Sequence, residues 1–118
     1  MSNNNFVVDG NLGKDPVLRT VDVNGEQREV MEFSVYVERR VPDGNGGFED
    51  KGGFWLPGAL WGRRARMTHQ NLKKGMRVHA VGELRREAWE KDGEQRSAMK
   101  LDAEAVYIDP ISYARRDR

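Results

Sequence analysis

Alternating apolar and polar positions dominate this chain and predict β-strands rather than helices. The clearest example is the segment 29–39 (EVMEFSVYVER), where the alternation is regular. One face of this strand would be apolar and the other polar, with Met31, Phe33, Val35 and Val37 set against Glu32, Ser34, Tyr36 and Glu38. Similar patterns predict four more strands, at residues 5–12, 54–61, 76–90 and 94–108.

A single segment has the features of a helix, residues 63–75 (RRARMTHQNLKKG). It contains no glycine or proline before its last position, two lysines lie in its last turn, and Gly75 would end it. Met67 and Leu72 are the side chains that we expect to anchor this helix to the core, which makes a narrow apolar stripe.

Turn signals separate the predicted elements. Asn24-Gly25 and Asp92-Gly93 are typical of tight hairpin turns. Residues 42–53 (PDGNGGFEDKGG) contain five glycines in twelve positions, which predicts a mobile loop that lies outside the core. These signals leave an order of three strands, one helix and two strands.

This order favours an all-β fold with one helix. The expected architecture is an OB-fold, a five-stranded Greek-key barrel with the helix between strands 3 and 4, and a small α+β sheet is the competing architecture. With 118 residues the chain fits one domain. We expect residues 1–109 to form this domain and residues 110–118 to form a short flexible tail.

The composition and the charge distribution exclude some classes of function. The chain has no cysteine, so it has no disulfide and no thiolate site, and no apolar run approaches the roughly 18 residues of a membrane helix. The charge is unevenly spread: residues 1–60 carry 6 basic and 10 acidic side chains, whereas residues 61–100 carry 11 basic and 5 acidic ones. A polyanionic partner would explain this asymmetry, and a solvated helix face beside ordinary strand surface would explain it as well.

The tryptophans fall on the side of their strands that should face away from the core. In residues 54–61, alternation places Trp55 and Trp61 together, provided that no bulge at the proline shifts the register. Trp89 also lies opposite the apolar side of its strand, on the same side as Arg85. The core set of the first of these strands would then be Phe54, Leu56, Gly58 and Leu60.

Exposed indoles beside arginines suit a single-stranded nucleic acid. Indole planes stack on any base, and arginine or lysine neutralises the phosphates. The alternative is that each tryptophan covers one end of the barrel or fills an oligomer contact. Neither histidine has a ligand or base partner at a suitable spacing, and no nucleophile, base and orienting group form a set, so an enzyme is not expected.

In order, these segments resemble the bacterial single-stranded DNA-binding (SSB) protein family. GNLGKDP (10–16) is similar to the family's first-strand signature, and FWLPGALWGRRA (54–65) to its aromatic third strand. LKKGMRVHAVGELRREAWEKDGEQR (72–96) is similar to its helix exit, fourth strand and tryptophan-bearing hairpin. The resemblance implies an OB-fold, sequence-tolerant binding of single-stranded DNA without catalysis, and usually a homotetramer.

The resemblance also implies roles for single residues. The family aromatics that stack on bases are matched by Trp55, Trp61 and Trp89. Basic positions along the DNA path are matched by Arg19, Arg63, Lys74 and Arg85. Further cations from the same parts of the chain complete the candidate set for phosphate contacts: Arg39, Arg40, Arg64, Lys73 and Arg86.

This chain departs from the family pattern in two places, which changes the expected stacking residues and the expected protein partners. The family usually has another tryptophan just after the second strand, where this chain has Arg39-Arg40-Val41, and an arginine there could stack through its guanidinium plane. Family members also typically continue into a long linker with an acidic tip that recruits repair proteins, whereas this sequence ends in YARRDR. The expectation is therefore a tail-less member without such a tip.

The expected function is binding and protection of single-stranded DNA, without sequence specificity, in replication, recombination or repair. The protein would act in the cytoplasm, with the nucleoid, as a homo-oligomer (a tetramer first, a dimer as the alternative), without a cofactor, a metal or a membrane. RNA stays open as a partner, because stacking does not read the sugar. The alternatives are a primosomal OB protein of the PriB type and an OB-type protein–protein interaction module with little DNA binding.

Overall fold

Strands make up most of the chain in this computed structural model, which describes residues 5–111. The elements of this part are β1 (Phe6–Leu12), β2 (Val17–Val23), β3 (Glu26–Val37), β4 (Arg40–Pro42), β5 (Phe48–Asp50), β6 (Phe54–Trp61), α1 (Arg63–His69), β7 (Arg77–Lys91) and β8 (Glu94–Ile108). Over the same residues no helix has the length and apolar character to cross a bilayer.

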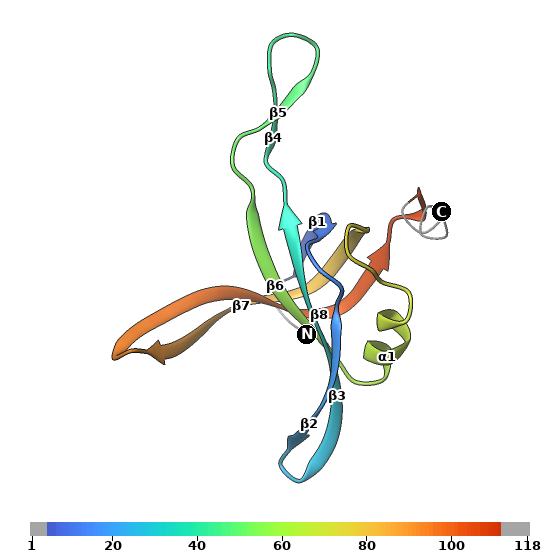
Figure 1. Cartoon of the computed structure of the whole chain (residues 1–118), viewed down its shortest axis with the longest axis vertical. Coiled ribbons are helices and arrows are strands. Elements are labelled where there is room, and N and C mark those ends of the chain that lie inside the picture. The colour runs from blue at the N-terminus through green and yellow to red at the C-terminus, as the bar shows by residue number, and fades with distance from the viewer. Residues whose placement is uncertain (1–4, 112–118) are drawn as a thin grey trace.

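A closed barrel of five strands forms the centre of the molecule (Figure 1). The strands follow the order β1-β7-β8-β6-β3, and β1 pairs with β3 at Asn11 and Leu12 to close the ring. All neighbours are antiparallel except β6 and β8, which run parallel where Gly58–Leu60 meet Leu101–Ala103. The helix follows β6 and precedes β7. The expected OB architecture is confirmed.

Strand β2 was not predicted, but its presence does not change the five-stranded barrel. Both β1 and β2 pair antiparallel with β3, the first at residues 35–36 of β3 and the second at residues 26–32. The two strands therefore follow one another along the same edge of β3. Asp15-Pro16 lies at the bend between them, where Pro16 is buried. In effect β1 and β2 are two halves of one bent strand.

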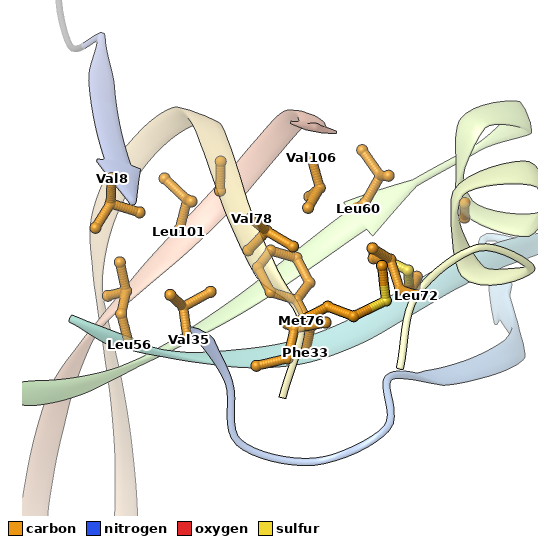
Figure 2. Close-up of a cluster of buried hydrophobic side chains, with 14 residues drawn as sticks. Val8, Phe33, Val35, Leu56, Leu60, Leu72, Met76, Val78, Leu101 and Val106 are labelled. Atoms are coloured by element: carbon orange, nitrogen blue, oxygen red, sulfur yellow. The ribbon is translucent and has the colours of Figure 1, made fainter. Parts of the chain in front are cut away.

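The core sits inside the barrel and is built from the predicted apolar faces. Met31, Phe33 and Val35 of β3 are each at most 3 % exposed, as the alternation indicates. Figure 2 shows Phe33 and Val35 beside side chains of the other barrel strands and of the turn after the helix. The members of the cluster are Val8, Leu12, Met31, Phe33, Val35, Leu56, Leu60, Ala65, Leu72, Met76, Val78, Ala80, Leu101 and Val106.

The helix is shorter than predicted and is anchored differently. It ends at His69 instead of reaching Gly75, and a turn follows it. The side-chain amide of Asn71 donates to the carbonyl of Met67, which is the acceptor that a continuing helix would use for the Asn71 backbone N–H. Met67 was expected to be an anchor but is 71 % exposed, whereas Ala65 is the buried helix residue. Leu72 is buried as predicted, from the turn.

Three two-stranded extensions project from the barrel: β2–β3, β4–β5 and β7–β8 (Figure 1). Asn24-Gly25 and Asp92-Gly93 have positive φ angles and join their strands as predicted. The glycine-rich segment 42–53 lies outside the core, as expected, but it is not only a loop. It contributes to the short ribbon β4–β5, in which Pro42 pairs with Phe48.

Candidate nucleic-acid interface

Strand β6 presents two tryptophans to solvent. The register between β3 and β6 runs without interruption from the pair Val30–Trp61 to the pair Val37–Phe54, so the proline does not shift the faces. Trp55 is 56 % exposed and Trp61 is 46 % exposed. Six residues of extended chain separate them, which is about 20 Å at roughly 3.3 Å per residue. The outward position predicted for both side chains is confirmed.

The two faces of β6 are less uniform than alternation suggests. Ala59 lies on the tryptophan side and is nevertheless buried, between Glu32 of β3 and Asp102 of β8. Phe54 was expected in the core set and is instead half exposed at the end of the barrel. β6 pairs with β3 along its whole length but with β8 only at Gly58–Leu60, so the side of Phe54 and the two ends of the strand are less covered than its middle.

Two neighbouring residues pack against the ring of Trp55 and fix its orientation. It lies against Gly13, where a Cβ atom would come within 2.1 Å of the indole Cζ3. The ring of Tyr36 packs beside it, with the two centroids 5.0 Å apart and the planes at 58°. This packing orients the indole in advance and leaves more than half of its surface for a ligand, which lowers the entropy lost on binding.

Tyr36 in turn is tied to β5. Its hydroxyl donates to Asp50 Oδ2 at 3.0 Å, and this hydrogen bond raises the pKa of Tyr36 above the ordinary value. The hydroxyl therefore stays protonated at neutral pH and continues to donate. The sequence offered no sign of this role, because Asp50 belongs to the glycine-rich segment.

Trp89 belongs to a different element from the other two tryptophans. It sits on the β7–β8 extension, where it pairs with Arg96 and is 43 % exposed. From Arg85 to Lys91 every residue of β7 is exposed, so the extension has no core side of its own. No ring contact joins the three tryptophans in the described structure, and any ligand that touches all of them has to be extended.

A hollow of about 350 Å³ opens on the tryptophan side of β6. Pro57, which lies between the two tryptophans along β6, lines it together with Ser34 of β3. Lys14 and Lys100 add positive charge to its wall, although Lys100 is paired with Glu87 at 3.6 Å. Sequence reasoning missed both lysines, because one lies in a turn and the other on β8, and only the folded register brings them together.

Two of the four basic residues that match the family's DNA path already form ion pairs with carboxylates. Arg19 forms an ion pair with Glu32, and Arg85 Nε donates to Asp102 Oδ2 at 2.5 Å. Among the wider set, Arg40 lies 3.6 Å from Glu38. Arg39 and Arg64 donate to backbone carbonyls, of Lys51 and Glu104 respectively.

The remaining candidate cations lie near the helix and on the β7–β8 extension. In residues 5–111 no carboxylate lies within ion-pair distance of Arg63, Lys73, Lys74 or Arg86. Arg63 follows Trp61 at the first position of α1, and the two lysines lie in the turn after it. These four cations are the ones best able to attract an anion, since no carboxylate of the described residues competes for them.

Replacing Asp102 with asparagine should tighten the binding of a single-stranded oligonucleotide. The change removes the carboxylate that holds Arg85. A surface ion pair is worth about 0 to 1 kcal/mol, so we expect up to roughly a fivefold gain in affinity at low salt. Fluorescence titration with oligo(dT) measures it.

Glu26→Gln is the matched control. It removes the same charge and also breaks an ion pair, with Arg28, at the tip of the β2–β3 hairpin. If both variants tighten binding equally, net charge is responsible and Arg85 has no particular role.

Comparisons with known proteins agree with this geometry. The model of the "Single-strand binding protein family" matches residues 3–109. A single-stranded DNA-binding protein of Treponema pallidum is 33 % identical over 105 residues, which is 89 % of this chain and 57 % of that protein. Single-stranded DNA-binding protein 2 of Chlorobaculum tepidum is 30 % identical over 104 residues, which is 87 % of this chain and 68 % of the relative.

Among solved structures, the small single-stranded DNA-binding protein from Streptomyces coelicolor has a similar fold. The TM-score is 0.78 at 22 % sequence identity, and the match covers 94 % of this chain and 98 % of that one. The chain thus spans nearly the whole of this small protein but little more than half of the Treponema relative. On the match of residues 3–109 and the two relatives, the chain belongs to the single-strand binding protein family.

Proposed function

We propose that this protein binds single-stranded DNA without sequence specificity and protects it during replication, recombination or repair. The observation that carries the proposal is the pair Trp55 and Trp61, half exposed on one side of a rigid barrel strand. Large aromatic side chains exposed together on one surface are typical of sites that bind a ligand. The relatives in Treponema pallidum and Chlorobaculum tepidum are named for the same ligand.

The mechanism combines stacking and neutralisation. Each base that stacks on an indole contributes about 1–3 kcal/mol, and every base has a face that can stack, so sequence matters little. Arg63, Lys73, Lys74 and Arg86 would neutralise phosphates first, and Arg19 and Arg85 would do so only after leaving their carboxylates. The protein acts as a binding protein in this proposal, with no cofactor and no catalytic step.

A homo-oligomer, most simply a tetramer, is part of the proposal. Strand β1 pairs with β7 along one edge, whereas its other edge meets β3 only at Asn11 and Leu12. Within residues 5–111 no strand pairs with this edge from Phe6 to Asp9, and Val7 is half exposed on the strand. An open strand edge with apolar side chains is a suitable site for a second copy. We place the protein in the cytoplasm, with the nucleoid.

A protein–protein interaction module is the second candidate, because of one apolar feature. A hollow of about 350 Å³ beside Trp55 is lined by Phe6, Phe54, Leu84 and Met99. If this hollow and the tryptophans together bound a protein, single-stranded DNA would bind weakly or not at all. The titration described next separates the two candidates.

Titrating the protein with poly(dT) should quench its tryptophan fluorescence, strongly at low salt and weakly at high salt. Four neutralised phosphates would give a slope of log affinity against log salt of about −3, from roughly −0.7 for each phosphate. A titration with poly(rU) under the same conditions tests the preference for DNA over RNA. A folded protein whose fluorescence does not change at low salt would contradict the proposal and favour the interaction module.

A further inference from the structure

Phe48 is an exposed aromatic side chain outside the barrel. It lies on β5 of the β4–β5 ribbon, which extends beyond the barrel in Figure 1, and it is 63 % exposed. The guanidinium carbon of Arg40 lies 5.7 Å from the centre of its ring. Phe48 is not part of the core cluster or of the residues packed against it. Its exposure therefore has no explanation in the stability of the barrel.

The register of the ribbon places Phe48 and Arg40 on one side. Pro42 pairs with Phe48 and Arg40 pairs with Asp50, and directly paired residues point to the same side of a ribbon. Phe48 and Asp50 are two positions apart on β5, so they also share a side. Val41 and Glu49, which pair with each other, point to the opposite side.

This side of the ribbon continues the tryptophan surface of the barrel. Asp50 accepts the hydrogen bond from the Tyr36 hydroxyl, and the ring of Tyr36 packs against Trp55. Tyr36 and Trp55 are a directly paired set on β3 and β6. A chain of contacts therefore leads from Trp55 through Tyr36 and Asp50 to the side of the ribbon that carries Phe48.

We propose that Phe48 and Arg40 form a further nucleotide-binding site, in which a base of the single strand stacks on the phenyl ring and its phosphate approaches the guanidinium. A strand that leaves Trp55 would continue along the ribbon to this site. The inference rests on the proposed function and adds a residue that the sequence did not single out. A base, and not an apolar partner, is the expected occupant because the ring borders a cation and continues a surface of exposed indoles.

Charge is not the main attraction at this site. Both nearby cations already have a carboxylate partner. Arg40 Nε lies 3.6 Å from Glu38 Oε2, and Lys51 Nζ lies 3.0 Å from Glu49 Oε1. Stacking should therefore supply most of the affinity. It follows that the effect of removing the ring should be nearly the same at low and at high salt, in contrast to the effect of removing a phosphate contact.

Phe48→Ala should lower the affinity for a long oligo(dT) by about 5- to 100-fold, which corresponds to one lost stacked base. Phe48→Leu, which keeps apolar bulk without an aromatic face, should lose nearly as much. Phe48→Trp should bind at least as well as the wild type and should add to the fluorescence quenching. Val41→Ala, on the other side of the same ribbon, is the control and should bind like the wild type.

Three results would overturn the inference. The first is wild-type affinity in Phe48→Ala while Trp55→Ala binds weakly, which leaves the proposed function standing. The second is wild-type affinity in Phe48→Leu, because apolar bulk would then be sufficient. The third is a change in oligomeric state in Phe48→Ala, measured by sedimentation, which would assign the ring to a contact between copies. A wild-type protein that binds no single strand would instead contradict the proposed function itself.

Discussion

Replacing both Trp55 and Trp61 with alanine is expected to lower the affinity for oligo(dT) by roughly 30-fold to 10⁴-fold. Each substitution removes one stacked base, worth about 1–3 kcal/mol. The two sites are far enough apart along β6 for their effects to add, since independent sites beyond about 10 Å are usually additive. Neither indole belongs to the core cluster, but each is about half covered and Trp55 packs against Gly13 and Tyr36, so the double variant should lose roughly 1–3 kcal/mol of the free energy of unfolding.

The measurement is an oligo(dT) titration followed by anisotropy of a labelled oligonucleotide, since the variant has lost most of its intrinsic signal. Each single variant is measured alongside the double variant. Met67→Ala is the control, because Met67 is also large, apolar and exposed but is not aromatic. If the double variant loses no more than Met67→Ala does, the indoles of β6 are not the binding surface.

Leu60→Ala should have the largest effect on stability, a loss of about 2–5 kcal/mol. Leu60 is 1 % exposed and belongs to the core cluster, and it is paired with Met31 of β3 and Ala103 of β8. A small domain has a total free energy of unfolding of about 5–15 kcal/mol, so this one substitution would remove a large share of it. The lost free energy has two parts: the burial of the methyl groups that are removed, and the cost of the cavity that they leave.

Urea unfolding at one fixed protein concentration measures this loss, because an oligomer's stability depends on concentration. Val17→Ala is the control, since Val17 is about half exposed on β2. Equal unfolding midpoints for the two variants would mean that Leu60 is not in a close-packed core. At low temperature the folded fraction of Leu60→Ala should still bind DNA, because its tryptophans are unchanged.

The barrel strands could be predicted because alternation is a local signal. Met31, Phe33 and Val35 reveal their shared face without any knowledge of what they touch. The outward position of Trp55 and Trp61 follows from the same rule. Strand β2 was missed because its apolar residues do not alternate regularly: Leu18, which packs against the core, falls on the opposite side from Val21 and Val23. The helix end was missed because a side-chain hydrogen bond of Asn71 decided it.

The charges of the candidate site could not be predicted, because they depend on register. Arg19 and Glu32 are 13 positions apart, and Arg85 and Asp102 are 17 apart. Only the pairing of their strands shows that these cations are already neutralised. Phe48 was missed for a different reason. It is a single aromatic residue in a glycine-rich segment, and its side of the ribbon is defined only once β4 and β5 pair.

The parallel pairing of β6 with β8 has a consequence for how the protein is made. Gly58 of β6 meets Leu101 of β8, a partner 43 positions later in the chain. At about 5–20 residues per second, a ribosome needs roughly 2–9 seconds to add that many residues. During this time the newly made β6 has an open edge and no finished core beneath it. The strand that carries Trp55 and Trp61 therefore takes its final place only after Leu101 has been made, and until then it can pair with the wrong partner.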